Sequence, residues 1–121
     1  MTEAEAFEIA QIASANALTA FTVYITFAFG YLAAAYFVGK QLSRTQAIIL
    51  SLLYALSATS CALAHLGYLE AQGAASAQAP TYYPSSILNN TDFWRLYMGP
   101  LEGLGIFASL YFMWSTRRSE D

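Results

Sequence analysis

The sequence predicts an all-α fold, a membrane-embedded bundle of three transmembrane helices with its N-terminus outside the cytoplasm and its C-terminus cytoplasmic. Apolar residues make up 57% of the 121 residues and charged residues only 11%, which is far from the usual composition of a soluble protein. Three long charge-poor stretches, residues 17–38, 47–69 and 96–114, lie between short charged segments. Each is close to the roughly 20 residues that an α-helix needs to cross about 30 Å of hydrocarbon.

The alternative is a helical bundle that buries these stretches in water. Helices of such a bundle would carry charged residues every three or four positions along an outer face, and no such stripe is present. The sequence therefore favours a single membrane domain over residues 1–121. Its helices are expected at about residues 13–38, 45–69 and 92–116, with an outer loop at about residues 70–91.

Local signals at the helix ends support this division. Thr2 and Glu5 have the spacing of a capping box, and the helix formers up to residue 12 are expected to lead helically into the first span. Residues 40–45 form a short polar link, which predicts that the first and second helices are antiparallel neighbours. Asn90 or Thr91 can cap the third helix.

The predicted loop is the only long connection in the chain. Its glycine, two prolines and many small residues are typical of irregular structure. It is also the expected surface for a protein partner outside the membrane, through four aromatic and apolar residues: Tyr82, Tyr83, Ile87 and Leu88.

The orientation follows from the positions of lysine and arginine. Lys40, Arg44, Arg117 and Arg118 fall on one side of a three-span arrangement, whereas Arg95 stands alone on the other. The positive-inside rule therefore places the short link and the C-terminus in the cytoplasm. For so short a chain with this charge bias, a multi-pass protein of a bacterial inner membrane is the expectation.

Two ionisable side chains interrupt the apolar stretches, His65 in the second and Glu102 in the third. A charged side chain at the centre of a bilayer costs about 2.5 to 3.5 kcal/mol to insert, so such groups normally face protein, water or a ligand. We therefore expect His65 and Glu102 to contact each other.

Polar residues at helical spacing give each helix one polar side. In the third helix they recur every seven residues from position 95 to 116, and similar stripes run over residues 16–26 and 51–65. If all three stripes face inward, five residues in the outer half of the membrane form a candidate ligand or proton site: Glu102, His65, Arg95, Asn16 and Thr19.

Two other interpretations of these polar residues stay open. Hydrogen bonds between membrane helices contribute about 0.6 kcal/mol each and are common, so the residues can have a purely structural role. They can also contact a partner subunit.

Small residues predict where the helices approach closely. Gly99 and Gly103 have GxxxG spacing, and Pro100 between them removes one backbone donor from the third helix. Gly30 and Ala34 offer a similar small surface on the first helix. This pattern fits packing within the chain or between two copies of it.

Several function classes lack their signals. The sequence has no phosphate-binding glycine loop, HExxH motif or nucleophile elbow, so no catalytic residue and no enzymatic activity are expected. One cysteine and one histidine offer no metal site of zinc-finger spacing, and no cofactor is expected. Five basic residues at a net charge of -3 exclude a nucleic-acid surface.

The leading hypothesis is a non-enzymatic accessory or assembly subunit of a membrane complex, surrounded by lipid and bound to a protein partner. The alternative is a proton-coupled or small-ligand binding or transport protein that uses Glu102, His65 and Arg95. A homo-oligomer that packs through Gly99 and Gly103 is a third hypothesis.

Overall fold

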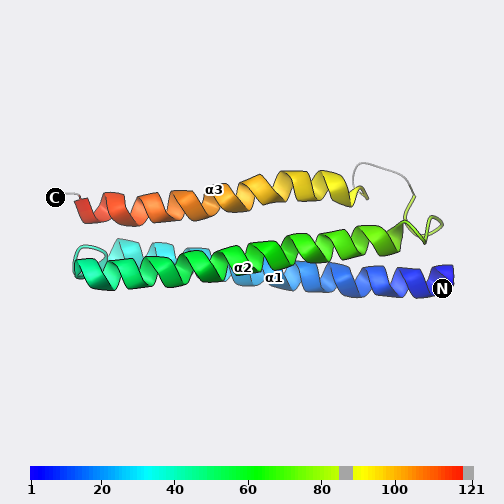
Figure 1. Ribbon diagram of the computed structural model, residues 1–121, viewed down its shortest axis with the longest axis horizontal. Coiled ribbons are helices and arrows are strands. Elements are labelled where there is room, and N and C mark those ends of the chain that lie inside the picture. The colour runs from blue at the N-terminus through cyan, green and yellow to red at the C-terminus, as the bar shows by residue number, and fades with distance from the viewer. Residues whose placement is uncertain (85–88, 119–121) are drawn as a thin grey trace.

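The computed structural model describes residues 1–84 and 89–118, and these residues form three long α-helices, of which the first and third run in the same direction and the second runs antiparallel to both (Figure 1). The helices are α1, Glu3–Val38, α2, Arg44–Ser76, and α3, Thr91–Arg118. The N-terminus and the α2–α3 connection lie at one end of the bundle, called the loop end here. The α1–α2 link and the C-terminal end of α3 lie at the other, the link end. Ile87 and Leu88, part of the predicted partner surface, fall outside the described residues.

The first helix includes the helical lead-in expected up to residue 12, and the second helix is longer than the sequence predicts. Because Thr2 caps α1 by accepting a hydrogen bond from the Glu5 N–H at 3.1 Å, the helix already begins at Glu3. At the other boundary α2 continues to Ser76 rather than ending near residue 69, since the intervening residues are mostly alanine, glutamate and glutamine, which are good helix formers. At 1.5 Å per residue α1 is about 54 Å long, well beyond the thickness of the hydrocarbon layer.

Two of the three helices, α1 and α2, are long and apolar enough to cross a membrane. Among the described helices α3 does not reach the same hydropathy, because Glu102, Pro100 and three glycines fall in its central part. A third crossing and the orientation of the bundle therefore stay predictions.

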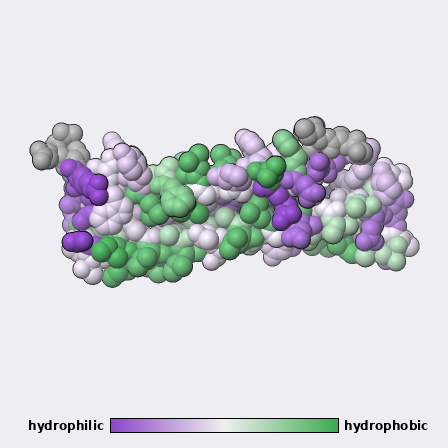
Figure 2. Space-filling model, turned by 45° about the horizontal axis from the view of Figure 1, so that its top comes forward, coloured by the Kyte–Doolittle hydropathy of each residue, from purple (hydrophilic) through white to green (hydrophobic). Residues whose placement is uncertain are grey.

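The packing of the bundle places small side chains inside and large apolar side chains outside. Alanines dominate the buried face of α1 and also occupy much of the buried face of α2. By contrast Phe29, Leu56 and Phe107 are all about two-thirds exposed or more. Figure 2 shows hydrophobic residues along much of the body of the molecule, with hydrophilic residues at its two ends and in a patch right of centre. A bundle in water would bury these large side chains, whereas lipid favours them outside and lets small residues bring the helices close.

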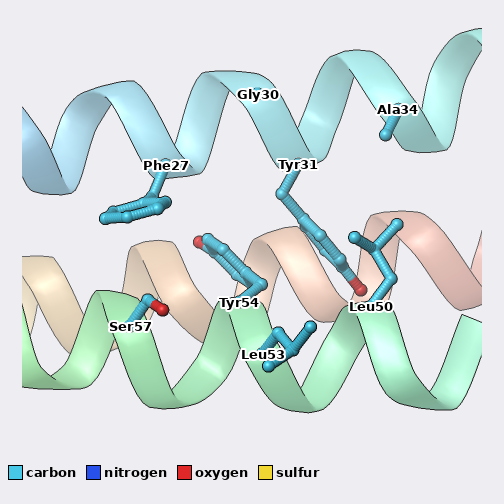
Figure 3. Close-up of a pocket in the computed structure, with 8 residues that line it drawn as sticks. All are labelled: Phe27, Gly30, Tyr31, Ala34, Leu50, Leu53, Tyr54 and Ser57. Carbon is cyan, nitrogen blue, oxygen red and sulfur yellow. The ribbon is translucent and has the colours of Figure 1, made fainter.

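Aromatic side chains fill the middle of the α1–α2 interface. The rings of Tyr31 and Tyr54 stack with their centroids 4.1 Å apart and 5° between their planes, and Tyr31 shares a 2.7 Å hydrogen bond with Ser51. Figure 3 shows these two tyrosines between the helices, at a shallow groove of about 250 Å³ that Phe27 and Gly30 also line. The tyrosine pair thus fixes the register of α1 against α2.

Each end of the bundle is tied by polar contacts. At the link end Ser43 and Gln46 form a capping box that starts α2, and the Arg117 guanidinium donates hydrogen bonds to the carbonyl oxygens of Gly39 and Leu42. Arg117 therefore holds the C-terminal turn of α3 against the α1–α2 link.

At the loop end, the segment after α2 folds back on the start of α1. The Phe7 and Tyr82 rings stack with a centroid distance of 4.5 Å, and the Thr81 N–H donates to Glu3 Oε1 at 2.6 Å. That hydrogen bond lowers the pKa of the exposed Glu3 carboxyl group. Asn90 caps α3 by accepting from the N–H groups of Asp92 and Phe93, as expected.

Candidate functional site

The central feature of the bundle is a buried contact between α2 and α3. His65 Nδ1 lies 2.6 Å from Glu102 Oε1. His65 is 6% exposed and Glu102 only 1%, so both groups are shielded from the surroundings. The structure thus contains the contact expected from the sequence, while its role stays a prediction.

The two helices that carry this pair present it on their inner faces. On α2, Ser51, Tyr54 and Ala58 share the buried side with His65. On α3, Glu102 lies on the same buried side as Ile106 and Ser109, and the Ser109 hydroxyl donates to the Gly105 carbonyl of its own helix. The polar stripes predicted for the second and third helices therefore face the interior over this region.

The first helix completes the surroundings of the pair with aromatic side chains. The Phe21 ring lies 5.2 Å from the His65 ring, centroid to centroid, and the Tyr24 hydroxyl donates a 2.6 Å hydrogen bond to the backbone carbonyl of Glu102. Gly105 makes room for that hydroxyl, because a Cβ atom at this position would collide with it. Tyr24 is itself 4% exposed, and it covers part of the pair on the α1 side.

The pair needs exactly one proton between its two contacting atoms. Both a ring nitrogen and a carboxyl oxygen can accept, so a 2.6 Å contact requires a hydrogen on one of them. Imidazolium with carboxylate, imidazole with carboxylic acid, and neutral imidazole protonated on Nδ1 with carboxylate all satisfy this requirement. Only the first two have no net charge. A neutral pair that holds one mobile proton is an arrangement suited to a low-dielectric interior.

The second carboxyl oxygen of Glu102 takes no part in the contact with His65. Glu102 Oε2 is buried and has no hydrogen-bond partner among the described residues. A buried carboxyl oxygen without a partner is energetically unfavourable, since it has lost its hydration without gaining a hydrogen bond. Such an atom indicates a position where a donor can bind.

A groove lies directly beside Glu102, between α1 and α3. It has a volume of about 490 Å³, and its surface is almost entirely carbon. Aromatic and aliphatic side chains from the two helices form its walls, including Phe21, Phe29, Leu32, Leu101, Ala108 and Phe112.

Three of the five predicted site residues lie elsewhere. Asn16 and Thr19 are exposed, and the Thr19 hydroxyl donates to the Ala15 carbonyl of its own helix at 3.0 Å. A threonine satisfied in this way has no need of the bundle interior. The guanidinium of Arg95 lies 3.7 Å from Glu70 and 3.8 Å from Asp92, in a partly exposed ion-pair network towards the loop end. The prediction that these three residues join His65 and Glu102 is wrong for this structure.

The predicted packing residues also divide into two groups. Gly99 faces α2, where a Cβ atom would lie 3.6 Å from Leu66. Gly103 and Gly30 have open space at the corresponding position, and Ala34 lines the shallow groove of Figure 3 together with Gly30. Gly99 therefore serves packing within the chain, whereas Gly103 and Gly30 do not.

Tyr24 and Gly105 belong to the site but are not among the residues predicted from the sequence. A signal for Tyr24 is present, because Ala10, Ala17, Tyr24 and Tyr31 recur every seven residues, and all four are buried. This spacing marks the inner face of α1 better than its threonines do. Gly105 has no comparable signal, since its role depends on the length of a tyrosine from another helix.

Comparisons with known protein families, curated proteins and solved structures found no match to this chain. The site is therefore interpreted from its own geometry. Within residues 1–84 and 89–118 no three side chains of histidine, cysteine, aspartate or glutamate come together as metal ligands would.

Proposed function

We propose that this chain is a three-span membrane protein that binds a proton, and a small ligand coupled to it, at the His65–Glu102 pair. The observation that carries the proposal is the 2.6 Å contact between two ionisable side chains that are almost fully buried. Ionisable groups inside membrane helices are costly to insert and most often serve ions, protons or ligands. Arg95 takes no direct part, because its partners are Glu70 and Asp92.

The proposal includes a third crossing by α3, a cytoplasmic link end and a location in a bacterial inner membrane. Lys40, Arg44, Arg117 and Arg118 belong to the link end, in agreement with the positive-inside rule. Glu102 lies about 9 Å along α3 from residue 96, where the third apolar stretch begins, so in this orientation the pair occupies the outer half of the membrane. Protons would then reach it from the outer side.

The test uses the fact that His65 is the only histidine. In protein labelled with ¹⁵N-histidine and reconstituted into lipid nanodiscs, NMR reports the two ring nitrogens of this one side chain. We expect these signals to change with pH. In Glu102→Gln, whose amide cannot take up the proton, we expect both the signals and their pH response to differ from those of the native protein.

Glu70→Gln is the matched control, because it removes an exposed carboxylate from the same bundle and should leave the His65 signals unchanged. Signals that are independent of pH, or identical in the native protein and Glu102→Gln, would contradict a proton-binding pair. If Glu102→Gln instead fails to accumulate in the membrane, the pair has a structural role.

A second candidate is a non-enzymatic accessory or assembly subunit of a membrane complex. The observation that favours it is the exposed strip of α3 at Gly103, where open space adjoins the exposed Leu104 and Phe107. Such a strip suits close approach by another helix. Mild-detergent purification tests this role, since a stoichiometric co-purifying protein supports it and a single partner-free species opposes it.

A further inference from the structure

We propose that the α1–α3 groove binds a neutral aromatic alcohol from the membrane, whose hydroxyl group donates a hydrogen bond to Glu102 Oε2. The inference rests on the proposed function and specifies the ligand class of the same site. It combines two observations that the proton site alone does not use: the Glu102 oxygen without a partner and the carbon-lined groove of about 490 Å³ that Glu102 helps to line.

The polar part of the ligand follows from the state of the pair. In both neutral states of the pair the shared hydrogen lies between Oε1 and His65 Nδ1, so Oε2 carries no proton and needs a partner that donates one. An anionic group is repelled by the carboxyl oxygen. A cationic head group costs about 2.5 to 3.5 kcal/mol to bring to mid-membrane depth. A hydroxyl donates without carrying charge, so it fits this oxygen best.

The apolar part of the ligand follows from the groove. Phe21 and Phe29 contribute aromatic walls from α1, and Phe112 contributes one from α3. Flat rings stack favourably on such side chains. A phenol or quinol ring with an alkyl or isoprenoid tail therefore matches both the volume and the surface.

Access to the groove is from the side of the bundle. Leu101, Phe29 and Phe112 are exposed as well as lining it, so in a membrane the groove faces the lipid tails. A phospholipid head group stays at the membrane surface, whereas a neutral phenol or quinol enters the hydrocarbon layer. The ligand would then reach Glu102 from within the bilayer.

The experiment compares two probes that differ only at the donor. Full-length protein labelled with ¹⁵N-histidine in nanodiscs is titrated with 4-hexylphenol and, in parallel, with its methyl ether 4-hexylanisole, while the His65 ring signals are followed. We expect a saturable shift with the phenol and an apparent affinity at least about tenfold weaker for the ether, because the ether cannot donate.

Two substitutions locate the binding. Ala108→Phe fills the groove without touching the pair, and it should abolish the phenol-induced shift. Ala64→Phe adds the same side chain at an exposed position of α2 that lines none of the described grooves, and it should leave the shift unchanged.

Equal effects of the two probes, a shift that does not saturate, or binding that survives Ala108→Phe would overturn the inference. If His65 still responds to pH and to Glu102→Gln in that case, the proton site stands and only the ligand class is wrong. If His65 shows neither response, the proposed function and this inference fail together.

Discussion

Gly103 and Gly105 lie two positions apart on α3 and have opposite surroundings. A Cβ atom at Gly103 would meet nothing within 4 Å, whereas at Gly105 it would collide with the Tyr24 hydroxyl that binds the Glu102 carbonyl. Only the second glycine is therefore required for the closed site. The difference gives a matched pair of substitutions.

Gly105→Ala is expected to destabilise the bundle by about 1 to 3 kcal/mol, because Tyr24 must move away and its hydrogen bond is lost. Gly103→Ala should be neutral or slightly stabilising, since alanine favours a helix over glycine by about 1 kcal/mol. Thermal unfolding in detergent, followed by circular dichroism, measures both effects.

Adding Tyr24→Phe to Gly105→Ala tests the stated cause. Without the hydroxyl the alanine methyl group no longer collides, so the double variant should lose less stability than the two single variants summed. Strict additivity would show that Tyr24 is not what Gly105 accommodates.

Individual site residues differed in how far the sequence could predict them. His65 and Glu102 are the only acidic or basic side chains within the three apolar stretches. Because an ionisable side chain without a partner is costly to insert into a membrane, the sequence predicts that the two contact each other. Thr19 could not be placed in this way, because its hydroxyl finds an acceptor on its own helix and is compatible with either face. Arg95 pairs instead with Asp92 of its own helix and with Glu70 of α2. These two carboxylates are nearer to it than the buried carboxyl group of Glu102.

At the scale of the elements, the type and order of the helices could be predicted, and their ends only in part. Capping at Thr2, Ser43 and Asn90 sets the three starts, and the expected caps at Thr2 and Asn90 are present. The sequence does not predict the end of α2 at Ser76, because Gly73, Pro80 and Pro84 indicate a loop after residue 69, whereas the alanine, glutamate and glutamine residues of that segment favour a helix.

The Glu3–Thr81 hydrogen bond makes the loop end sensitive to acid. Because the bond holds the Glu3 pKa below its ordinary value of 4.5, its stabilising effect is complete above that pH and is lost as the pH falls through the lowered pKa. We expect the Thr81 amide proton resonance to move upfield over this range. NMR of the reconstituted protein measures it.

Glu3→Gln should remove this pH response, and Glu5→Gln, an exposed carboxylate in the same helical turn, should retain it. A Thr81 resonance that titrates identically in all three proteins would exclude Glu3 as the cause.

At the scale of the whole molecule, the main question is whether α3 crosses the membrane as α1 and α2 are able to. The residues that build the site, above all Glu102, lower the hydropathy of α3. A helix that carries such a site is therefore harder to recognise as a membrane span from its hydropathy. Large apolar side chains are exposed on all three helices, among them Phe29, Leu56 and Phe107. For this reason we predict a third crossing.

Single cysteines in a Cys61→Ala background test this prediction with a membrane-impermeant maleimide applied to intact cells. Glu5→Cys should be labelled, whereas Gln41→Cys and Arg118→Cys should be labelled only after the membrane is opened. If α3 does not cross, Arg118→Cys reacts on the same side as Glu5→Cys. All three positions are at exposed helix ends or in the link, so the substitutions disturb no described side-chain contact.

The contact between Arg117 and the α1–α2 link also sets an order of assembly. The carbonyl oxygens of Gly39 and Leu42 are brought together only when the link has folded between the two helices. Arg117 follows both helices in the chain and is synthesised after them, so we expect it to bind a turn that α1 and α2 have already formed. We therefore predict that α3 docks onto a preformed pair of α1 and α2, with Arg117 joining its last turn to their link.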